Sequence, residues 1–309
     1  MPAVSVCIPA YRQVAALEQA LDSLVVQRFT NYDVVITDDS PDSEVEALIR
    51  TYDFGGRLRY FRNPHPLGAP RNWDEAIRLS HAPLIKMLHP HDRFAHPDAL
   101  GRFVALMDEN PDCLLGFAAS RVEDEAGQTS LNAADPAQLA DLKRRPERLL
   151  LGDVIGSASA AIRRRAPPLE YDPRLTRLVD VDLHLRALRL NPRLAYLEEP
   201  LTLISTEPPP STPEDRTLEV REALVIFQKV FDQLHDDPDA ALYWWRMLKR
   251  HKVRSFKQLV RLGEPPPALA AYFRRLYACP PRDGERSLAD ALTAPFRLAW
   301  RPIHTLFKS

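Results

Sequence analysis

Short β-rich runs alternate with amphipathic helical segments through the first 120 residues of the chain. Strands are predicted at about residues 4–9, 33–37, 58–61, 84–88 and 113–119, with helical periodicity between them. Parallel strands need crossover connections, and helices at this short spacing supply them as right-handed βαβ units. The sequence therefore predicts an α/β fold in which a mostly parallel sheet is flanked by helices.

Three of these strands end in residues that can bind a ligand. They are Pro9 and Tyr11 after the first strand, Asp38 and Asp39 after the second, and His91 and Asp92 after the fourth. Ligands in open α/β sheets bind beyond the carboxyl ends of the strands, so we expect these residues on one rim. An imidazole beside a carboxylate can form half of a divalent-metal site. Taken alone, His91 and Asp92 would suit a solvated polar loop better, but three strand ends together favour a binding site.

Two common classes of nucleotide-binding protein lack their signatures here. The sequence contains no Gly-x-Gly pair and no Gly-Lys-Ser/Thr motif. This absence argues against dinucleotide oxidoreductases and P-loop ATPases, which hold phosphates in such turns. The cysteines Cys7, Cys113 and Cys279 are far apart and show no metal-type spacing, so we expect reduced packing residues.

A second group of candidate residues follows residue 150. Gly156, Ser157 and Ser159 belong to a segment of small residues that permits close approach and leads into an apolar strand. Asp180 and Asp182 lie in the first turn of a predicted helix. Carboxylates at this position stabilise the helix dipole, so both aspartates can be simple caps, and one of them can equally point into a cleft.

The C-terminal part differs from the rest in composition. A Pro-rich stretch at residues 207–214 predicts a stiff linker between a domain of residues 1–206 and a helical region of residues 215–309. Residues 241–309 contain 14 Lys and Arg against 4 Asp and Glu, whereas residues 1–240 contain 27 against 38. Basic helices rich in aromatic residues suit ordinary packing with solvated cations, and they also suit peripheral membrane contact.

The sequence also carries expectations about location and partners. It has no run of 18 apolar residues, and its N-terminus lacks the charged and apolar regions of a signal peptide. We expect a cytoplasmic protein whose basic C-terminal helices could touch the inner face of the membrane. No nucleic-acid partner is expected.

Five segments together resemble the inverting glycosyltransferase family 2, which has the GT-A fold. In chain order they are Val4-Ser-Val-Cys-Ile-Pro-Ala-Tyr11, Val35-Ile-Thr-Asp-Asp-Ser40, Gly68-Ala-Pro-Arg-Asn72, Lys86-Met-Leu-His-Pro-His-Asp92 followed by Pro97-Asp98, and Asp180-Val-Asp-Leu-His-Leu-Arg186. The resemblance covers about residues 1–205, and five motifs in the right order are far more specific than any one of them. It implies a GT-A-type sheet and transfer of a sugar from a nucleotide-diphosphate donor to a hydroxyl of a glycan or lipid-linked acceptor.

The resemblance implies a role for each candidate residue. The nucleotide would be surrounded by Pro9, Tyr11, Asp38, Asp39 and Arg71. Asp39 would accept a hydrogen bond from a pyrimidine ring N–H, which favours uridine- or thymidine-type donors. Asp180 would be the general base, and Asp92 with His91 would bind Mn²⁺ or Mg²⁺ at the diphosphate. The acceptor side would be bordered by Gly156, Ser157, Ser159 and Asp182.

Two features depart from the family pattern. Its metal motif is usually acidic at two or more positions, and here His89 and His91 stand where carboxylates are common. Such a site should hold a hard divalent ion more weakly and lose it below the His pKa of roughly 6.5. The frequent His after the last strand is also missing, and Leu203-Ile-Ser-Thr206 occupies that region.

These departures leave a second hypothesis open, a catalytically weak sugar-nucleotide-binding scaffold whose helical tail docks a partner or a membrane. A related nucleotidyltransferase ranks last, because the first loop, Pro9-Ala-Tyr-Arg12, lacks the glycine-rich sequence that holds a triphosphate.

Overall fold

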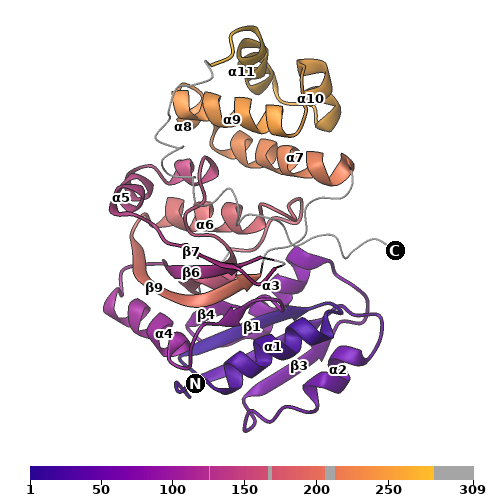
Figure 1. Cartoon of the computed structure of the whole chain (residues 1–309), viewed down its shortest axis with the longest axis vertical. Coiled ribbons are helices and arrows are strands. Elements are labelled where there is room, and N and C mark those ends of the chain that lie inside the picture. Colours follow the sequence, from indigo (N-terminus) through magenta and orange to yellow (C-terminus); the bar gives the residue numbers. More distant parts are fainter. Residues whose placement is uncertain (125, 166–168, 206–212, 282–309) are drawn as a thin grey trace.

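The computed structural model describes residues 1–124, 126–165, 169–205 and 213–281, with the side chains of residues 213–216 excepted. A single sheet crosses the molecule, with helices against its faces and a stack of further helices at one end (Figure 1). The strand order is β3-β2-β1-β4-β8-β6-β9-β5, and β7 pairs with β6.

The N-terminal half of the sheet is parallel, as predicted. Its strands are β1 (Val4–Ala10), β2 (Tyr32–Asp38), β3 (Leu58–Arg62) and β4 (Leu84–Met87). The crossover helices are α1 (Val14–Val25), α2 (Glu44–Ile49) and α3 (Ala69–Leu79). Because β1 and β2 pair residue for residue up to Ala10 and Asp38, their carboxyl ends lie at the same edge of the sheet.

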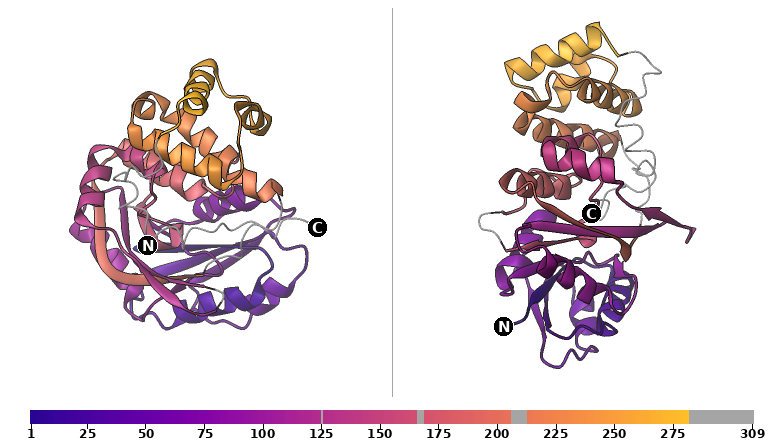
Figure 2. Two further views of the ribbon diagram at one scale, coloured as in Figure 1. Left: turned by 45° about the horizontal axis from the view of Figure 1, so that its top comes forward. Right: turned by 90° about the vertical axis from the view of Figure 1, so that its left-hand side faces the viewer.

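The other half of the sheet is mixed, so the predicted parallel arrangement applies to β3-β2-β1-β4. Its strands are β5 (Arg93–Phe94), β6 (Leu115–Glu123), β7 (Thr129–Asn132), β8 (Ala161–Arg164) and β9 (Leu194–Ser205). β8 runs antiparallel to both β4 and β6, whereas β6 and β9 are parallel. The long β9 curves along the edge of the sheet, and its end pairs with β5 (Figure 2).

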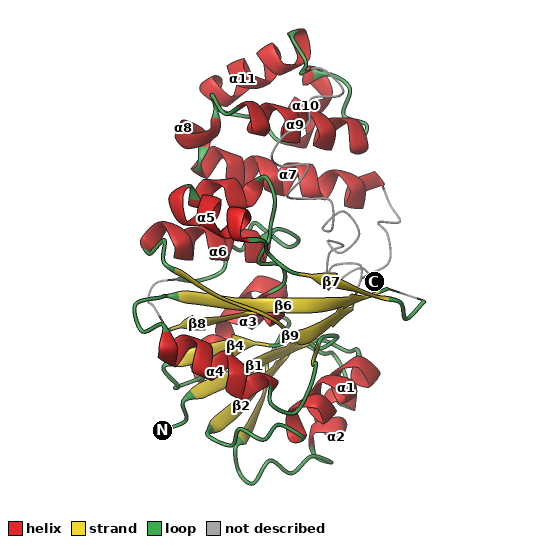
Figure 3. Ribbon diagram, turned by 60° about the vertical axis from the view of Figure 1, so that its left-hand side comes forward, coloured by secondary structure: helices red, strands yellow, loops and turns green. Residues whose placement is uncertain are grey.

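The sheet separates two hydrophobic cores. One is formed with α1, α2 and α4 (Ala99–Glu109), which contribute Leu21, Val45 and Phe103 among others. The other is formed with α3, α5 (Pro136–Arg144) and α6 (Val179–Leu190), to which Trp73 and Leu185 belong. Helices therefore cover both faces of the sheet (Figure 3), as expected for an α/β fold.

The predicted C-terminal helices are present. They are α7 (Pro213–Lys229), α8 (Phe231–Leu234), α9 (Pro238–Arg250), α10 (Phe256–Leu262) and α11 (Pro267–Ala278). Trp244 is fully buried among them, with its ring 5.2 Å from that of Phe227 and 4.9 Å from that of Phe273 between centroids. This cluster is continuous with the core around α6. Most of the predicted linker, and residues 282–309 of the predicted helical region, lie outside the described residues.

Basic side chains are exposed on the last three of these helices and on the loop between α9 and α10. They are Lys249, Arg250, Lys252, Arg254, Lys257, Arg261, Arg274 and Arg275. Within the described ranges, none of the helices combines the length and the apolar character needed to cross a bilayer.

Candidate active site

The carboxyl ends of β1, β2 and β4 meet at one rim, as expected. The Asp39 N–H donates to the Ala10 carbonyl at 3.0 Å, and the Leu88 N–H donates to the Cys7 carbonyl at 2.9 Å. These bonds bring the loops after three separate strands together beside β1. The candidate residues on these loops therefore belong to one site.

The loop after β4 holds a cluster of three possible metal ligands. One ligand atom from each of His89, His91 and Asp92 lies within 4.8 Å of the others. The sequence predicted His91 and Asp92, and the structure adds His89, whose ring lies 4.6 Å from the Trp73 ring between centroids. Two imidazoles and one carboxylate suit Mn²⁺ and related divalent ions, so the residues present fit a metal site.

Serines from two distant segments orient the Asp92 carboxylate. The Ser157 hydroxyl donates to Asp92 Oδ2 and the Ser205 N–H donates to Asp92 Oδ1, both at 3.3 Å. The Ser205 hydroxyl also donates to the His91 carbonyl at 2.9 Å. Ser205 ends β9, in the region where the family frequently has a His, and that correspondence was the one sequence signal for it.

Hydrogen bonds from Lys86 of β4 and from His89 hold the segment around Ser159. The His89 N–H donates to the Ser159 hydroxyl at 2.9 Å, and the buried ammonium of Lys86 donates to the Ser159 and Met87 carbonyls. Burial lowers the pKa of Lys86 to about 7, and the Asp92 carboxylate opposes that shift. Gly156 precedes this segment with φ of +81°, a left-handed conformation that favours glycine. Sequence reasoning missed Lys86, which lies within an apolar strand.

Asp180 lies in the first turn of α6, next to the same segment. Its Oδ2 accepts the Ala158 N–H at 3.0 Å, and its Oδ1 is buried without a hydrogen-bond partner among the described residues. Burial is the main cause that raises the pKa of Asp180, to about 7, and the Asp153 and Asp92 carboxylates add to it. A buried carboxyl group with a pKa raised toward neutral pH is a candidate general acid or base.

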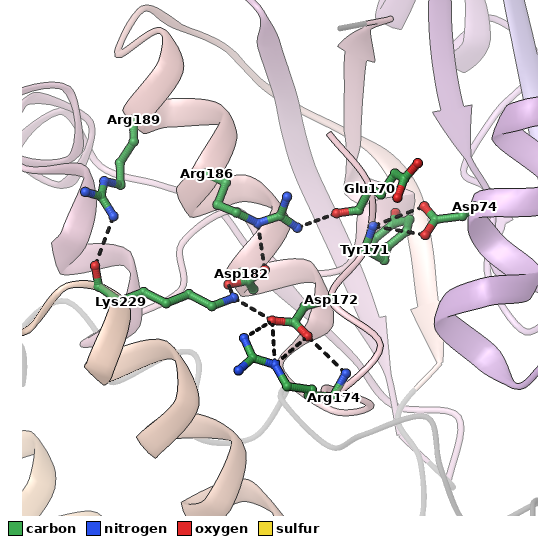
Figure 4. Close-up of polar contacts among 9 residues, drawn as sticks. All are labelled: Asp74, Glu170, Tyr171, Asp172, Arg174, Asp182, Arg186, Arg189 and Lys229. Carbon is green, nitrogen blue, oxygen red and sulfur yellow. Dashed lines mark hydrogen bonds and ion pairs between the residues drawn. The ribbon is translucent and has the colours of Figure 1, made fainter. Parts of the chain in front are cut away.

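Asp182 takes a different position from Asp180. Its carboxylate pairs with Arg186 at 2.8 Å and with Lys229 of α7, and Lys229 also pairs with Asp172 (Figure 4). Residues two positions apart on a helix point to opposite sides. The structure therefore brings Asp180 to Ala158 and turns Asp182 toward the C-terminal helices, and a role for Asp182 at the acceptor stays a prediction.

The two aspartates at the end of β2, Asp38 within the strand and Asp39 just beyond it, are both held by neighbouring groups. Asp38 accepts the Tyr60 hydroxyl at 2.7 Å and the Ser40 N–H at 2.8 Å. Asp39 accepts the Asn63 amide at 2.6 Å, the Gly68 N–H at 2.9 Å, and the Leu67 N–H on both oxygens at 3.1 Å. Asp39 thereby shapes the loop that precedes α3, and a base N–H would have to share these oxygens.

The remaining nucleotide candidates surround this loop. Pro9 is buried within β1, and Tyr11 is partly buried just beyond it, with the Arg12 guanidinium 5.3 Å above its ring. Arg71 is exposed in the first turn of α3. A guanidinium at a helix N-terminus is placed to meet an anionic group.

A model of the family described as "Glycosyl transferase family 2" matches residues 5–166. The match covers more than half of the chain and includes the ends of β1, β2 and β4 and the segment around Ser159. The chain belongs to glycosyl transferase family 2. It is a glycosyltransferase with a GT-A-type fold, as the sequence predicted.

Relatives of this family 2 chain occur in several bacteria. A protein of Mycobacterium tuberculosis (strain CDC 1551 / Oshkosh), described as uncharacterized, is 28% identical over 265 residues, which are 79% of this chain and 81% of the relative. An "Uncharacterized glycosyltransferase" of Haemophilus influenzae is 24% identical over 205 residues, which are 64% of this chain and 67% of the relative.

Solved structures share the fold of this family 2 chain at low sequence identity. S. aureus TarS 1-349 in complex with UDP-GlcNAc has a TM-score of 0.59 and 16% identity, and the alignment covers 89% of this chain and 80% of TarS 1-349. The mannosyltransferase PcManGT from Pyrobaculum calidifontis, in complex with GDP-Man and Mn²⁺, has a TM-score of 0.54 and 15% identity, with 96% and 79% covered. The likeness extends over the fold alone.

Proposed function

We propose that this protein is an inverting, metal-assisted glycosyltransferase with Asp180 as general base. The observation that carries the proposal is the Asp180 carboxyl group, which is buried, has an oxygen without a described partner, and has a pKa raised to about 7. The segment of residues 157–159 contacts both Asp180, through the Ala158 N–H, and Asp92 of the metal-ligand cluster, through the Ser157 hydroxyl. A proton acceptor near a site that can hold the donor's diphosphate is what a displacement at the anomeric carbon needs.

In the proposed step, an acceptor hydroxyl attacks the anomeric carbon of the donor from the face opposite the diphosphate. A bond forms between the hydroxyl oxygen and that carbon, and the bond from the carbon to the diphosphate oxygen breaks. The proton of the hydroxyl goes to Asp180 Oδ1, and the diphosphate leaves with the electron pair. Inversion follows because attack and departure are on opposite faces.

His89, His91 and Asp92 would hold the Mn²⁺ or Mg²⁺ ion. When bound there, the ion would neutralise charge that develops on the leaving diphosphate. The Ser157 and Ser205 hydrogen bonds hold the Asp92 carboxylate in place for this role. A site with two imidazoles should prefer Mn²⁺ over Mg²⁺, because Mg²⁺ binds oxygen ligands more readily than nitrogen.

We infer that the donor is a UDP- or dTDP-sugar that lies over the ends of β1 and β2. Pro9, Tyr11 and the Asp38-Asp39 pair would face its base and ribose, and Arg71 its phosphates. UDP-GlcNAc in the TarS complex supports a uridine donor, whereas GDP-Man in the PcManGT complex shows that the fold accepts other bases. Asp39 would favour a pyrimidine by accepting its ring N–H.

The proposed acceptor is a hydroxyl of a glycan or of a lipid-linked precursor, bordered by Gly156, Ser157 and Ser159.

The exposed cations of α9–α11 support peripheral contact with an anionic membrane surface at the inner face. Deleting residues 241–309 should then abolish binding to anionic vesicles, and binding that survives the deletion would exclude this contact.

A thermal-shift panel tests the proposed donor and metal. UDP, dTDP, GDP and CDP are compared with Mn²⁺, with Mg²⁺ and without metal. A ligand at 100 times its Kd stabilises by about 2.7 kcal/mol, which should raise the melting temperature by roughly several degrees. A metal-dependent shift with UDP or dTDP supports the proposal. No shift with any nucleotide contradicts it.

A further inference from the structure

The helix that carries Asp180 begins without a cap of its own. The residue before α6 is Leu178, whose side chain cannot accept a hydrogen bond. The first N–H groups of a helix have no partners inside it, so a buried helix start needs an acceptor from elsewhere. Leu178 and Asp180 are both buried. The placement of the proposed base therefore depends on a group outside α6.

That group is Glu222, which belongs to α7 in the C-terminal helical region and is 2% exposed. One of its carboxylate oxygens accepts the N–H and the hydroxyl of Thr176, at 2.8 and 2.6 Å. The other accepts the N–H groups of Arg177 and Leu178, both at 2.7 Å. Charge-assisted hydrogen bonds are about twice as strong as neutral ones, so Glu222 holds the chain that enters α6 firmly.

A second tie joins Lys229, at the end of α7, to Asp182 in the first turn of α6 and to Arg189 in its last turn. The Lys229 ammonium pairs with Asp182, and the Arg189 guanidinium donates to the Lys229 carbonyl at 3.1 Å (Figure 4). Figure 4 also shows Lys229 bridging from Asp182 to Asp172, which lies in the loop before the helix. Glu222 thus holds the approach to α6, while Lys229 holds its first turn from the same side.

We propose that Glu222 and Lys229 are positioning residues for Asp180, so that the C-terminal helices form part of the catalytic machinery. This inference rests on the proposed role of Asp180 as general base. Because Asp180 and Asp182 point to opposite sides of α6, fixing Asp182 on α7 sets the rotation of the helix and aims Asp180 at Ala158. A misplacement of about 1 Å in such a group can cost about 100-fold in rate.

The test compares Glu222→Gln with a matched control, Glu219→Gln. Glu219 lies on the same helix, and its ion pairs are with His251 at 3.1 Å and Arg250 at 4.0 Å inside the helical region. The Arg177 charge also acts on its carboxylate, but Glu219 accepts none of the N–H groups that Glu222 holds. Each variant loses one carboxylate charge from α7. In Glu222→Gln one of the two accepting oxygens becomes an NH2 group, so either the Thr176 N–H or the N–H groups of Arg177 and Leu178 lose their acceptor.

Three quantities are measured on the full chain with Mn²⁺ and a panel of UDP- and dTDP-sugars: kcat for nucleotide release, KM for the donor, and amide hydrogen exchange. In Glu222→Gln we expect kcat to fall on the order of tenfold or more, donor KM to change less than about twofold, and exchange to rise across residues 174–183. Glu219→Gln should keep the wild-type kcat. If α7 merely supported the fold, the loss of a carboxylate at either position would lower kcat in both variants.

Lys229→Met provides a second variant, which keeps most of the length of the side chain and removes its charge, in case Glu222→Gln fails to fold. An unchanged kcat in Lys229→Met and in any folded Glu222→Gln would overturn the inference, as would an equal loss of kcat in Glu219→Gln. Failure of the proposed function looks different, since wild-type protein would then release no nucleotide. In that case, amide exchange at residues 174–183 of Glu222→Gln still tests whether Glu222 holds the start of α6. Unchanged exchange would contradict this, and raised exchange would support it.

Discussion

Replacing Asp180 with Asn should abolish transfer and, above neutral pH, make the folded protein more stable. One oxygen of the carboxylate accepts the Ala158 N–H, and the other is buried without a described partner. Burial raises the pKa of this carboxyl from 3.8 to about 7, whereas in the unfolded chain it ionises near the lower value. The folded protein therefore binds the proton more tightly, and ionisation of Asp180 opposes folding.

The magnitude follows from the rise of the Asp180 pKa from 3.8 to about 7, which corresponds to at most about 4 kcal/mol. This cost is absent below about pH 4, grows as the pH rises, and is complete above about pH 7. Asn cannot ionise, so the variant does not have this ionisation cost. A buried Asn amide without a hydrogen-bond acceptor, however, lowers the free energy of unfolding by about 1–3 kcal/mol. We expect a net gain of about 1–3 kcal/mol at pH 8.5, or several degrees in melting temperature.

The assay is urea unfolding of both proteins in EDTA at pH 4 and pH 8.5, together with transfer measured at pH 8.5 with Mn²⁺. Loss of a general base typically costs about 10²–10⁴ in rate. Asp182→Asn is the control on the same helix turn, and it should destabilise at both pH values because it leaves Lys229 without one of its ion-pair partners. A gain for Asp180→Asn that is equal at the two pH values would refute the argument from ionisation, and retained transfer would remove Asp180 as the base.

Three further predictions concern other parts of the site. His91→Ala should weaken Mn²⁺ binding at least tenfold in an electron paramagnetic resonance titration, and an unchanged titration would remove this ligand. Asp39→Asn should lower both the melting temperature and UDP affinity, because the carboxylate holds the Leu67 and Gly68 amides; wild-type affinity by calorimetry would contradict this. Lys86→Met should flatten the rise in stability between pH 7 and 10, since the folded protein loses the Lys86 proton near pH 7 and the unfolded chain only near 10.5. Equal slopes in both proteins would show that this lysine stays charged.

Local sequence patterns were sufficient to predict most elements of the fold. The strands predicted at residues 4–9 and 84–88 are β1 (Val4–Ala10) and β4 (Leu84–Met87), because short apolar β-rich runs mark buried strands. The mixed half of the sheet was not predictable in this way. The four residues of β8 do not indicate which strands it pairs with. Its antiparallel pairing with β4 and β6 joins strands far apart in sequence. Such pairing depends on which surfaces the whole chain buries together.

Local sequence patterns were enough to select the candidate residues for the proposed chemistry, because strand ends and helix starts follow from local residue types. In this way Asp92, Asp180 and the pair at the end of β2 could be selected in advance. The tertiary structure alone decided what each of them contacts: Ser157 and Ser205 reach Asp92 from 65 and 113 residues away. It also buried Asp180, and that burial accounts for its raised pKa. Burial and hydrogen-bond partners arise between distant segments, so a local pattern does not encode them.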